Sequence, residues 1–332
     1  MSNNLLARFA ESIFWLARYM ERIENLARVL DVTETHARTH LGNQDWATIL
    51  EINSDHERFS ASNTRISGAA VIYFYLLERD NPTSIASGMA LARESARTLR
   101  HLISTEMWFQ INMLNGRVQA LRKRDVTPAK LSGVCAMIKE GCQAHAGITE
   151  GTLYRDAVWC FYQLGKAIER CDQTSRLVDI GYRRAMISLR EEDARIVDSQ
   201  LNTMLRSAAG YQAFRRRHTV RLHTDEVVDF LLFDSDFPRA MMTALNDAHA
   251  ILLRLEGRHH ITTSADALKI LSDLRLDVLK ITAKDVLDSG LHGFIDGVQQ
   301  RLIACTDALG SGCFGHSSDH GDETPETAPL PS

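Results

Sequence analysis

The sequence has few helix breakers, since it contains only six prolines in 332 residues. Three of them lie in the polar C-terminal segment, and the other three stand where a helix could begin: Pro82, Pro128 and Pro238. Asn81 and Thr127 precede two of these prolines. Asparagine and threonine are favoured at the N-cap of a helix, and proline is favoured at its first position. Proline is therefore expected to delimit helices without interrupting them.

Strand signals are also scarce. Alternating runs of Val, Ile and Thr joined by Asn-Gly or Asp-Gly turns do not occur, whereas apolar residues recur at helical spacing. Leu16, Met20, Ile23, Ala27 and Leu30 share one helix face. The sequence predicts an all-α protein, with helices at about 5–40, 45–58, 62–78, 82–115, 128–148, 152–189, 192–208, 224–234, 238–257, 263–288 and 291–309.

Other absences argue against whole classes of partner. The formal charge is −4 and the tight basic run is short, Arg215–Arg217, so no nucleic-acid partner is expected. The longest apolar run, residues 69–77, is about half of what spans a membrane, and no signal peptide is evident. No CxxC pair occurs among the six cysteines, which indicates reduced thiols in a cytoplasmic protein: Cys135, Cys142, Cys160, Cys171, Cys305 and Cys313.

One segment occurs twice. Residues 14–32 recur in altered form at 162–180, and five of nineteen positions are identical at an offset of 148: Leu16/Leu164, Glu21/Glu169, Arg22/Arg170, Arg28/Arg176 and Asp31/Asp179. A second match aligns residues 74–85 with 230–241 at an offset of 156. Two matches at nearly equal offsets predict an internal duplication, with halves at 1–150 and 151–310 related by a pseudo-twofold axis in one helical bundle. A disordered polar tail is expected at 311–332.

The matched helices carry a repeated charged stripe. Its members are the candidate binding or structural residues: Glu21, Arg22, Glu24, Arg28, Asp31, Glu169, Arg170, Asp172, Arg176 and Asp179. Pairs four residues apart would also suit an ordinary solvent-exposed helix face. Such a face drifts freely in sequence, so the repetition favours buried charged contacts between helices. Binding or catalysis by the same carboxylates stays open.

Two loops also repeat, and both are predicted to lie beside the charged helices: Asp80, Asn81 and Pro82 in one, Asp236 and Pro238 in the other. Helix N-termini near these loops would offer N–H donors suited to a carboxylate. A cleft between loops and helices is therefore the predicted place for a partner or substrate.

Recognisable catalytic and metal motifs are missing. A di-metal bundle needs two Glu-x-x-His pairs, and only Glu256 with His259 fits. His36 and His40 could share a helix face but lack further ligands. Residues 310–315 match GxGxxG but follow a helix instead of a strand. The aromatic residues fit core packing: Trp15, Tyr19, Trp108, Trp159 and Phe161. We therefore assign no catalytic residue, metal or cofactor.

Six segments, taken in order, resemble the bacterial alpha-E family, a helical domain named for a Glu-Arg motif. They are LLARFAESIFWLARYMERIENLARVLDV, ERDNPTSI, ISTEMW, GKAIERCDQTSRLVDI, FRRRH and FLLFDSDFPRAM. The resemblance covers about 1–310 and places the motif on Glu21-Arg22 and again on Glu169-Arg170. Where the family commonly has Arg-Glu-Asn, this chain has Arg93-Glu94-Ser95.

Members of this family are typically encoded beside circularly permuted ATP-grasp ligases and transglutaminase-like peptidases. The resemblance thus implies a non-catalytic partner or substrate-presenting subunit of an ATP-grasp amide or peptide ligase system. Two alternatives stay open: an enzyme or peptide-binding protein that uses the Glu-Arg helices as acid and base or as a carboxylate clamp, and a structural oligomerisation module. The sequence does not decide the oligomeric state or the substrate.

Overall fold

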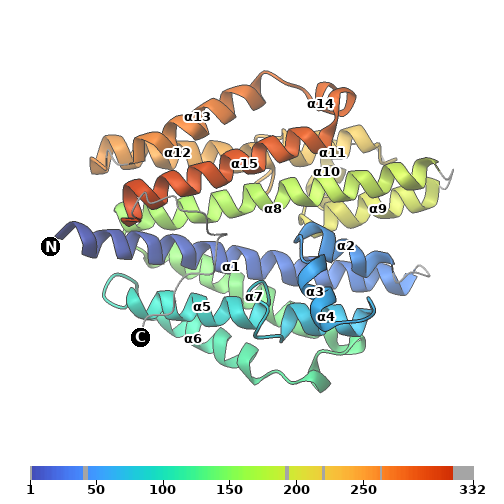
Figure 1. The fold of residues 1–332 in the computed structure, drawn as a ribbon, viewed down its shortest axis with the longest axis horizontal. Coiled ribbons are helices and arrows are strands. Elements are labelled where there is room, and N and C mark those ends of the chain that lie inside the picture. The colour runs from blue at the N-terminus through green and yellow to red at the C-terminus, as the bar shows by residue number, and fades with distance from the viewer. Residues whose placement is uncertain (1, 40–43, 191–193, 219–220, 262–263, 317–332) are drawn as a thin grey trace.

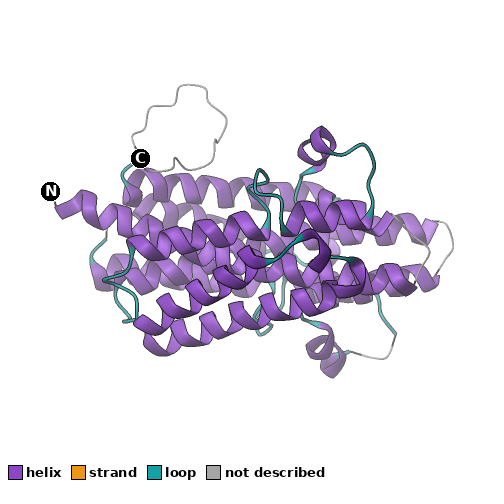
Figure 2. Cartoon of the chain, turned by 90° about the horizontal axis from the view of Figure 1, so that it is seen from below, coloured by secondary structure: helices purple, strands orange, loops and turns teal. Residues whose placement is uncertain are grey.

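The computed structural model describes residues 2–39, 44–190, 194–218, 221–261 and 264–316. All regular secondary structure in these ranges is helical, and they contain no strand (Figure 2). The predicted all-α class is confirmed.

The helices follow one another in the order drawn in Figure 1. The first group comprises α1 (Ser2–Thr39), α2 (Gln44–Ile52), α3 (His56–Ser62), α4 (Gly68–Leu76), α5 (Ile85–Thr98), α6 (Thr105–Ala120), the 3₁₀ turn η1 (Lys123–Asp125) and α7 (Pro128–Thr152). The second comprises α8 (Ala157–Arg190), α9 (Ala194–Ser207), α10 (Tyr211–Arg217), α11 (Thr224–Leu232), α12 (Met241–His259), α13 (Ala265–Leu279), α14 (Ala283–Ser289) and α15 (Leu291–Leu309).

Two long helices, α1 and α8, lie side by side at the centre of the bundle (Figure 1). On one side α5 and α7 pack against α1, with α6 outside them, and on the other α12 and α15 pack against α8, with α13 outside them. The apolar stripe predicted for α1 is buried in this contact region: Leu16, Met20, Ile23, Ala27 and Leu30. Burial of such a stripe is what stabilises a long amphipathic helix.

The central helices approach each other closely at Gly165. A Cβ atom at this position would overlap the backbone carbonyl oxygen of Phe14 on α1. A rigid backbone atom cannot move aside, so only glycine permits this spacing. The close approach brings the charged side chains further along both helices within reach of one another.

Helix boundaries differ from the prediction at the prolines. Pro128 does occupy the first position of α7, after Thr127. Pro82 instead lies in a turn, because Ser84 caps α5 by accepting a hydrogen bond from the Ser87 N–H. Pro238 likewise precedes α12 by a short turn, since that helix begins at Met241. The prediction that helices begin at residues 82 and 238 was wrong.

Two predicted helices are each divided by a capped turn. The range 82–115 contains α5 and α6, and Ser104 caps α6 by accepting from the Met107 N–H at 3.1 Å. The range 263–288 contains α13 and α14, where Thr282 and Asp285 form a capping box. Serine and threonine side chains satisfy helix N–H groups at such breaks, and we gave them too little weight beside the apolar periodicity.

The folded part extends slightly beyond α15. Gly310–Phe314 forms a π-helical turn, η3, so the disorder expected from residue 311 was wrong for residues 311–316. The Phe314 ring packs against Phe14 and Phe161, with centroids 5.3 and 5.9 Å apart. Residues 317–332 lie outside the described residues.

Several local features recur about 155 residues apart. Ser54 and Ala209 both adopt positive φ angles, 55° and 58°. Phe59 meets Phe74 edge to face at 5.2 Å, and the corresponding pair Phe214 and Phe230 does so at 5.4 Å. These correspondences support the proposed duplication into halves 1–150 and 151–310.

Candidate functional site

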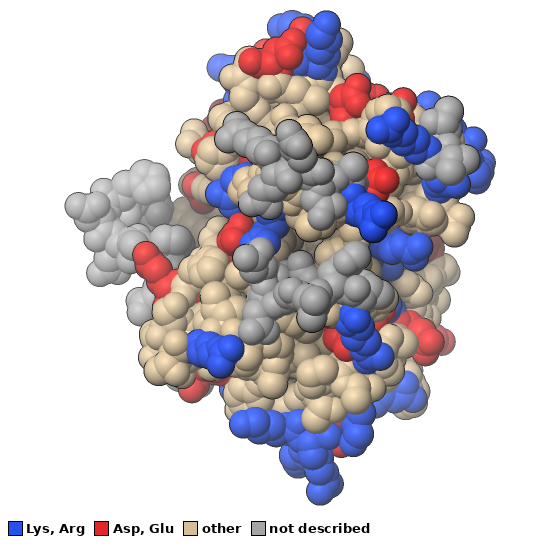
Figure 3. Space-filling view, turned by 90° about the vertical axis from the view of Figure 1, so that its right-hand side faces the viewer, with Lys and Arg blue, Asp and Glu red and all other residues tan. Residues whose placement is uncertain are grey.

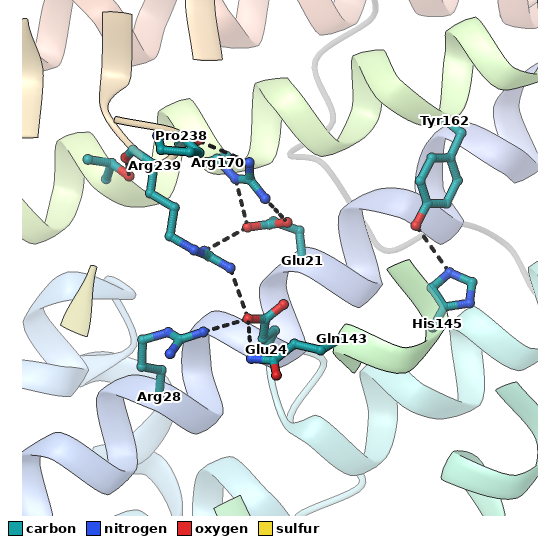
Figure 4. Close-up of polar contacts among 10 residues, drawn as sticks. Glu21, Glu24, Arg28, Gln143, His145, Tyr162, Arg170, Pro238 and Arg239 are labelled. Carbon is teal, nitrogen blue, oxygen red and sulfur yellow. Dashed lines mark hydrogen bonds and ion pairs between the residues drawn. The ribbon is translucent and has the colours of Figure 1, made fainter. Parts of the chain in front are cut away.

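The two Glu-Arg motifs bind each other across the contact of α1 and α8. Glu21 Oε1 and Oε2 accept hydrogen bonds from Arg170 Nε at 3.0 Å and Nη2 at 2.9 Å (Figure 4). Glu169 Oε1 and Oε2 accept from Arg22 Nε at 2.6 Å and Nη2 at 2.9 Å. Each glutamate therefore takes a two-pronged contact from the arginine of the other motif. Such planar contacts are the strongest of the charge-assisted hydrogen bonds.

Arg239 extends the network on the Glu21 side. Its Nη1 donates to Glu21 at 2.8 Å and its Nη2 donates to Glu24 at 2.9 Å, so this guanidinium bridges two carboxylates of α1 (Figure 4). Glu24 also accepts from Arg28 and from Gln143. We did not identify Arg239 from the sequence. Its position directly after Pro238 in the repeated loop was the signal available.

Arg18 completes the network on the Glu169 side. Its Nε donates to Glu169 Oε2 at 2.8 Å, and Gln173 Nε2 donates to Oε1 at 2.6 Å. The Arg18 guanidinium also lies over the Trp15 ring, 4.8 Å from its centroid. Arg18 stands one helical turn before Arg22, a spacing that suits two arginines converging on one partner. It too was absent from the sequence-based set.

The surrounding arginines keep both glutamates ionised. Burial alone would raise the pKa of Glu21, whose exposed fraction is 6%, but the charges of Arg239 and Arg170 outweigh burial and lower it to about 2. For Glu169, 1% exposed, the charges of Arg22 and Arg18 likewise overcome burial and lower the pKa to about 2. These carboxylates do not exchange protons near neutral pH. They fit the role of fixed acceptors.

Arg28 and Arg176 differ from the expectation of contacts between helices. Arg28 pairs with Glu24, and Arg176 Nε donates to Asp172 at 3.0 Å, each within its own helix. Arg176 adds only a long contact of 3.4 Å to Ser54 Oγ before α3. The within-helix geometry expected for a solvent-exposed face thus applies at these two positions, although both side chains are half-buried.

The last carboxylates of the stripe join α1 and α8 to outer helices. Asp31 accepts from Ser132 Oγ at 2.7 Å and from Lys139 Nζ at 2.6 Å, both on α7. Asp179 lies 3.0 Å from His292 Nδ1 on α15. The stripe therefore ties the central pair to the helices that flank it.

The repeated loops reach the network only in part. The Pro238 carbonyl accepts from Arg170 Nη1 at 3.0 Å, so this loop joins the network directly (Figure 4). Asn81 is buried and organises its own turn by donating to the Phe74 carbonyl and accepting from the Thr83 N–H. Pro82 is half-buried in that turn, and Asp80 and Asp236 are exposed. Within the part of the chain that is described, neither aspartate side chain forms a hydrogen bond or ion pair with the charged helices.

A small hollow lies on the Glu169 side of the central pair. It has a volume of about 200 Å³, and its lining includes Arg22, Asn53, Thr83, Asp172, Gln173 and Arg176. The Gln173 Oε1 atom is buried there without a hydrogen-bond partner among the described residues. On the Glu21 side, the long Arg239 side chain spans the two carboxylates of α1.

The described ranges contain neither a cluster of metal ligands nor a membrane-spanning helix. In the described ranges, no three His, Cys, Asp or Glu side chains gather as metal ligands. His40, one of the paired histidines, lies outside them. No helix in those ranges is long and apolar enough to cross a membrane. None of the six cysteines, all of which lie in the described ranges, forms a disulfide, and five are buried.

The fold and the site define an all-helical protein whose two central helices are joined by reciprocal glutamate and arginine pairs. The chain belongs to the Alpha-E family, described as a predicted alpha-helical domain with a conserved ER motif, whose model matches residues 5–314. The placement of that motif on Glu21-Arg22 and Glu169-Arg170 stays a prediction from the sequence.

Curated relatives carry no known activity. The chain is 23% identical over 276 residues to uncharacterised proteins of Mycobacterium bovis and of Mycobacterium tuberculosis strain CDC 1551, and 22% identical to one of strain H37Rv. Each match covers 75% of this chain but 30% of the relative. The chain therefore spans about a third of the length of the curated relatives that it matches. No solved structure matches it.

Proposed function

We propose that the chain is a non-catalytic helical partner or substrate-presenting subunit of an ATP-grasp amide or peptide ligase system. The observation that carries this proposal is the saturation of Glu21 and Glu169 by arginines, which lowers the pKa of each to about 2. An acid–base catalyst must exchange its proton near the working pH. The motif glutamates are therefore suited to holding two helices together, and the chemistry falls to a partner.

The class of partner comes from the family resemblance. Circularly permuted ATP-grasp ligases and transglutaminase-like peptidases are the typical genomic neighbours of alpha-E proteins. The length of the mycobacterial relatives gives further support, because the matched region is combined there with much additional sequence. We place the system in the cytoplasm, a reducing compartment that suits six cysteines without a disulfide among them.

The second candidate function is a peptide-binding protein that clamps a carboxylate. The hollow of about 200 Å³ favours it, since Arg22 and Arg176 line it with about 30% of each side chain exposed. Both guanidinium groups have N–H donors beyond those bound to Glu169 and Asp172. A terminal carboxylate of a peptide would match these donors.

Purification with and without the neighbouring ligase tests the two candidates. We expect the isolated chain to turn over no ATP and to co-elute with the ligase in size-exclusion chromatography. Arg176→Gln should leave co-elution unchanged if the partner surface lies elsewhere, and should weaken peptide capture if the clamp is real. Turnover of a peptide or amino-acid derivative by the isolated chain, abolished by Glu21→Gln in a still-folded protein, would sink the non-catalytic proposal.

A further inference from the structure

A second and larger cleft lies away from the motif glutamates. It has a volume of about 630 Å³ and is formed by α1, α7, α9 and the start of α10. Cavities of about 300 to 1,000 Å³ are typical of small-molecule sites. Its ionic lining residues are Arg28 and Asp31 from α1, Lys139 from α7 and Arg206 from α9.

Arg28 carries a positive charge that is only partly compensated. Its Nη2 donates to Glu24 Oε1, and its Nε is buried without a partner among the described residues. Glu24 is shared, because Arg239 donates to the same oxygen at 2.9 Å. Burial, followed by the neighbouring Arg239 charge, lowers the pKa of Arg28. A negatively charged ligand beside Arg28 would therefore balance the remaining positive charge.

Lys139 and Arg206 bring further positive charge to the cleft. Lys139 donates to Asp31 Oδ2, while Oδ1 of the same carboxylate is taken by Ser132. Arg206 is exposed, and its guanidinium lies over the face of Tyr211, 4.3 Å from the ring centroid. Three cations thus line the cleft against one carboxylate. On the end of the molecule that Figure 3 shows, Lys and Arg side chains occupy more of the visible surface than Asp and Glu side chains.

We propose that this cleft binds a small anionic molecule through Arg28, Lys139 and Arg206. Carboxylate and phosphate oxygens share the required chemistry, because both accept charge-assisted hydrogen bonds from guanidinium and ammonium groups. Hydroxyl and amide groups of Thr35, Asn202 and Tyr211 line the same space and would contact the rest of the ligand. The proposal rests on this cleft alone and does not require a ligase partner.

Isothermal titration calorimetry tests the proposal with defined probes. The carboxylate probe is a tri-glutamate peptide, the phosphate probe is inorganic pyrophosphate, and amidated tri-glutamine is the uncharged control. Each is titrated at low and at physiological ionic strength, since contacts between charges at the protein surface weaken as salt increases. The variants are Arg206→Gln and Lys139→Gln. Arg117→Gln, at an exposed position on α6, is the matched control.

At least one anionic probe should bind the wild type and Arg117→Gln equally, and the uncharged peptide should not bind. Arg206→Gln and Lys139→Gln should each weaken binding about tenfold. Arg206 makes no ion pair within the described residues, so its loss should leave the fold unchanged by circular dichroism. A response to peptide alone identifies a carboxylate ligand, and a response to pyrophosphate alone identifies a phosphate ligand. The proposal is overturned if no anionic probe binds, or if Arg206→Gln binds as tightly as Arg117→Gln.

Discussion

Glutamate and arginine stand next to each other in each motif, yet neighbouring residues on a helix do not face each other. Glu21 therefore pairs with Arg170, and Arg22 pairs with Glu169, across the central contact. Parallel helices place equivalent residues at the same level, so a motif present on both can pair reciprocally. This geometry explains why the two residue types occur together.

A buried histidine beside the network gives the protein a pH-sensitive residue. His145 is 1% exposed, its Nε2 lies 3.1 Å from Tyr162 Oη (Figure 4), and its Nδ1 has no partner in the described ranges. Burial, followed by the charge of Lys166, lowers the pKa of His145 from 6.5 to about 4. Between about pH 6.5 and pH 4, His145 is therefore neutral in the folded protein but protonated in the unfolded chain.

The predicted consequence is a loss of stability on acidification. The contribution of His145 is complete above pH 6.5 and falls as the pH decreases toward 4, reaching a loss of about 2 kcal/mol by pH 5. Urea unfolding at pH 7 and pH 5 measures this fall. His145→Gln should show a smaller fall than the wild type, whereas His101→Gln, at an exposed position, should behave like the wild type. An equal fall in His145→Gln and the wild type would contradict the assignment.

The motif glutamates do not change the stability in the pH range over which the effect of His145 is measured. The pKa values of Glu21 and Glu169 are lowered from 4.5 to about 2, so their contribution to stability is complete above pH 4.5. It is lost only as the pH falls toward 2. The free energy of unfolding should therefore fall in two pH ranges. The first lies between pH 6.5 and about 4 and is due to His145, and the second lies between pH 4.5 and about 2 and is due to the two glutamates.

At the scale of elements, the spacing of α1 and α8 depends on Gly165. We predict that Gly165→Ala lowers the free energy of unfolding by about 1 to 3 kcal/mol or more, because the added methyl group meets the Phe14 backbone. Gly147→Ala is the matched control on α7, where a Cβ meets nothing within 4 Å. It should stabilise the protein by about 0.5 to 1 kcal/mol, since alanine is the better helix former. Equal effects of the two variants would refute the close approach.

The helices could be predicted from the sequence because their apolar residues recur with the helical period over long stretches. The long helices α1 and α8 were predicted to within a few residues at each end. The breaks before Thr105 and Ala283 were missed because apolar periodicity continues on both sides of each break. They depend on the local caps Ser104 and Thr282, whose effect is visible only once the backbone turns are known.

The candidate site, like the helices, could be predicted only in part. The repetition indicated which residues of α1 and α8 matter, and Glu21, Arg22, Glu169 and Arg170 do meet between the helices. Arg239 was missed although its position next to Pro238 in the repeated loop was a signal. The cleft beside Arg206 could not be predicted, because it depends on which helix flanks which in three dimensions. The sequence alone does not show which helices become neighbours in the folded protein.

At the scale of the whole molecule, the two motifs connect residues that are about 150 positions apart. The proposed duplication accounts for this, since two copies of one helix can form reciprocal contacts when they pack together. The α8 helix also packs against α9, α12 and α15, while α1 packs against α5 and α7. The Glu-Arg pairs thus lie where the two proposed halves meet. Their loss should affect the joining of the halves more than either half alone.

The most direct test of this account is a double-mutant cycle on Glu21 and Arg170, measured by chemical unfolding. Breaking one buried pair typically costs about 3 to 5 kcal/mol, so Glu21→Ala and Arg170→Ala should each be strongly destabilising. The double variant should lose less than the sum of the two, with a coupling of about 2 kcal/mol. The exposed pair Glu94 and Arg97 on α5 is the control, and its coupling should not exceed about 0.5 kcal/mol. Additive losses at Glu21 and Arg170, with a coupling no larger than in the control pair, would contradict the claim that the Glu-Arg motifs join the central helices.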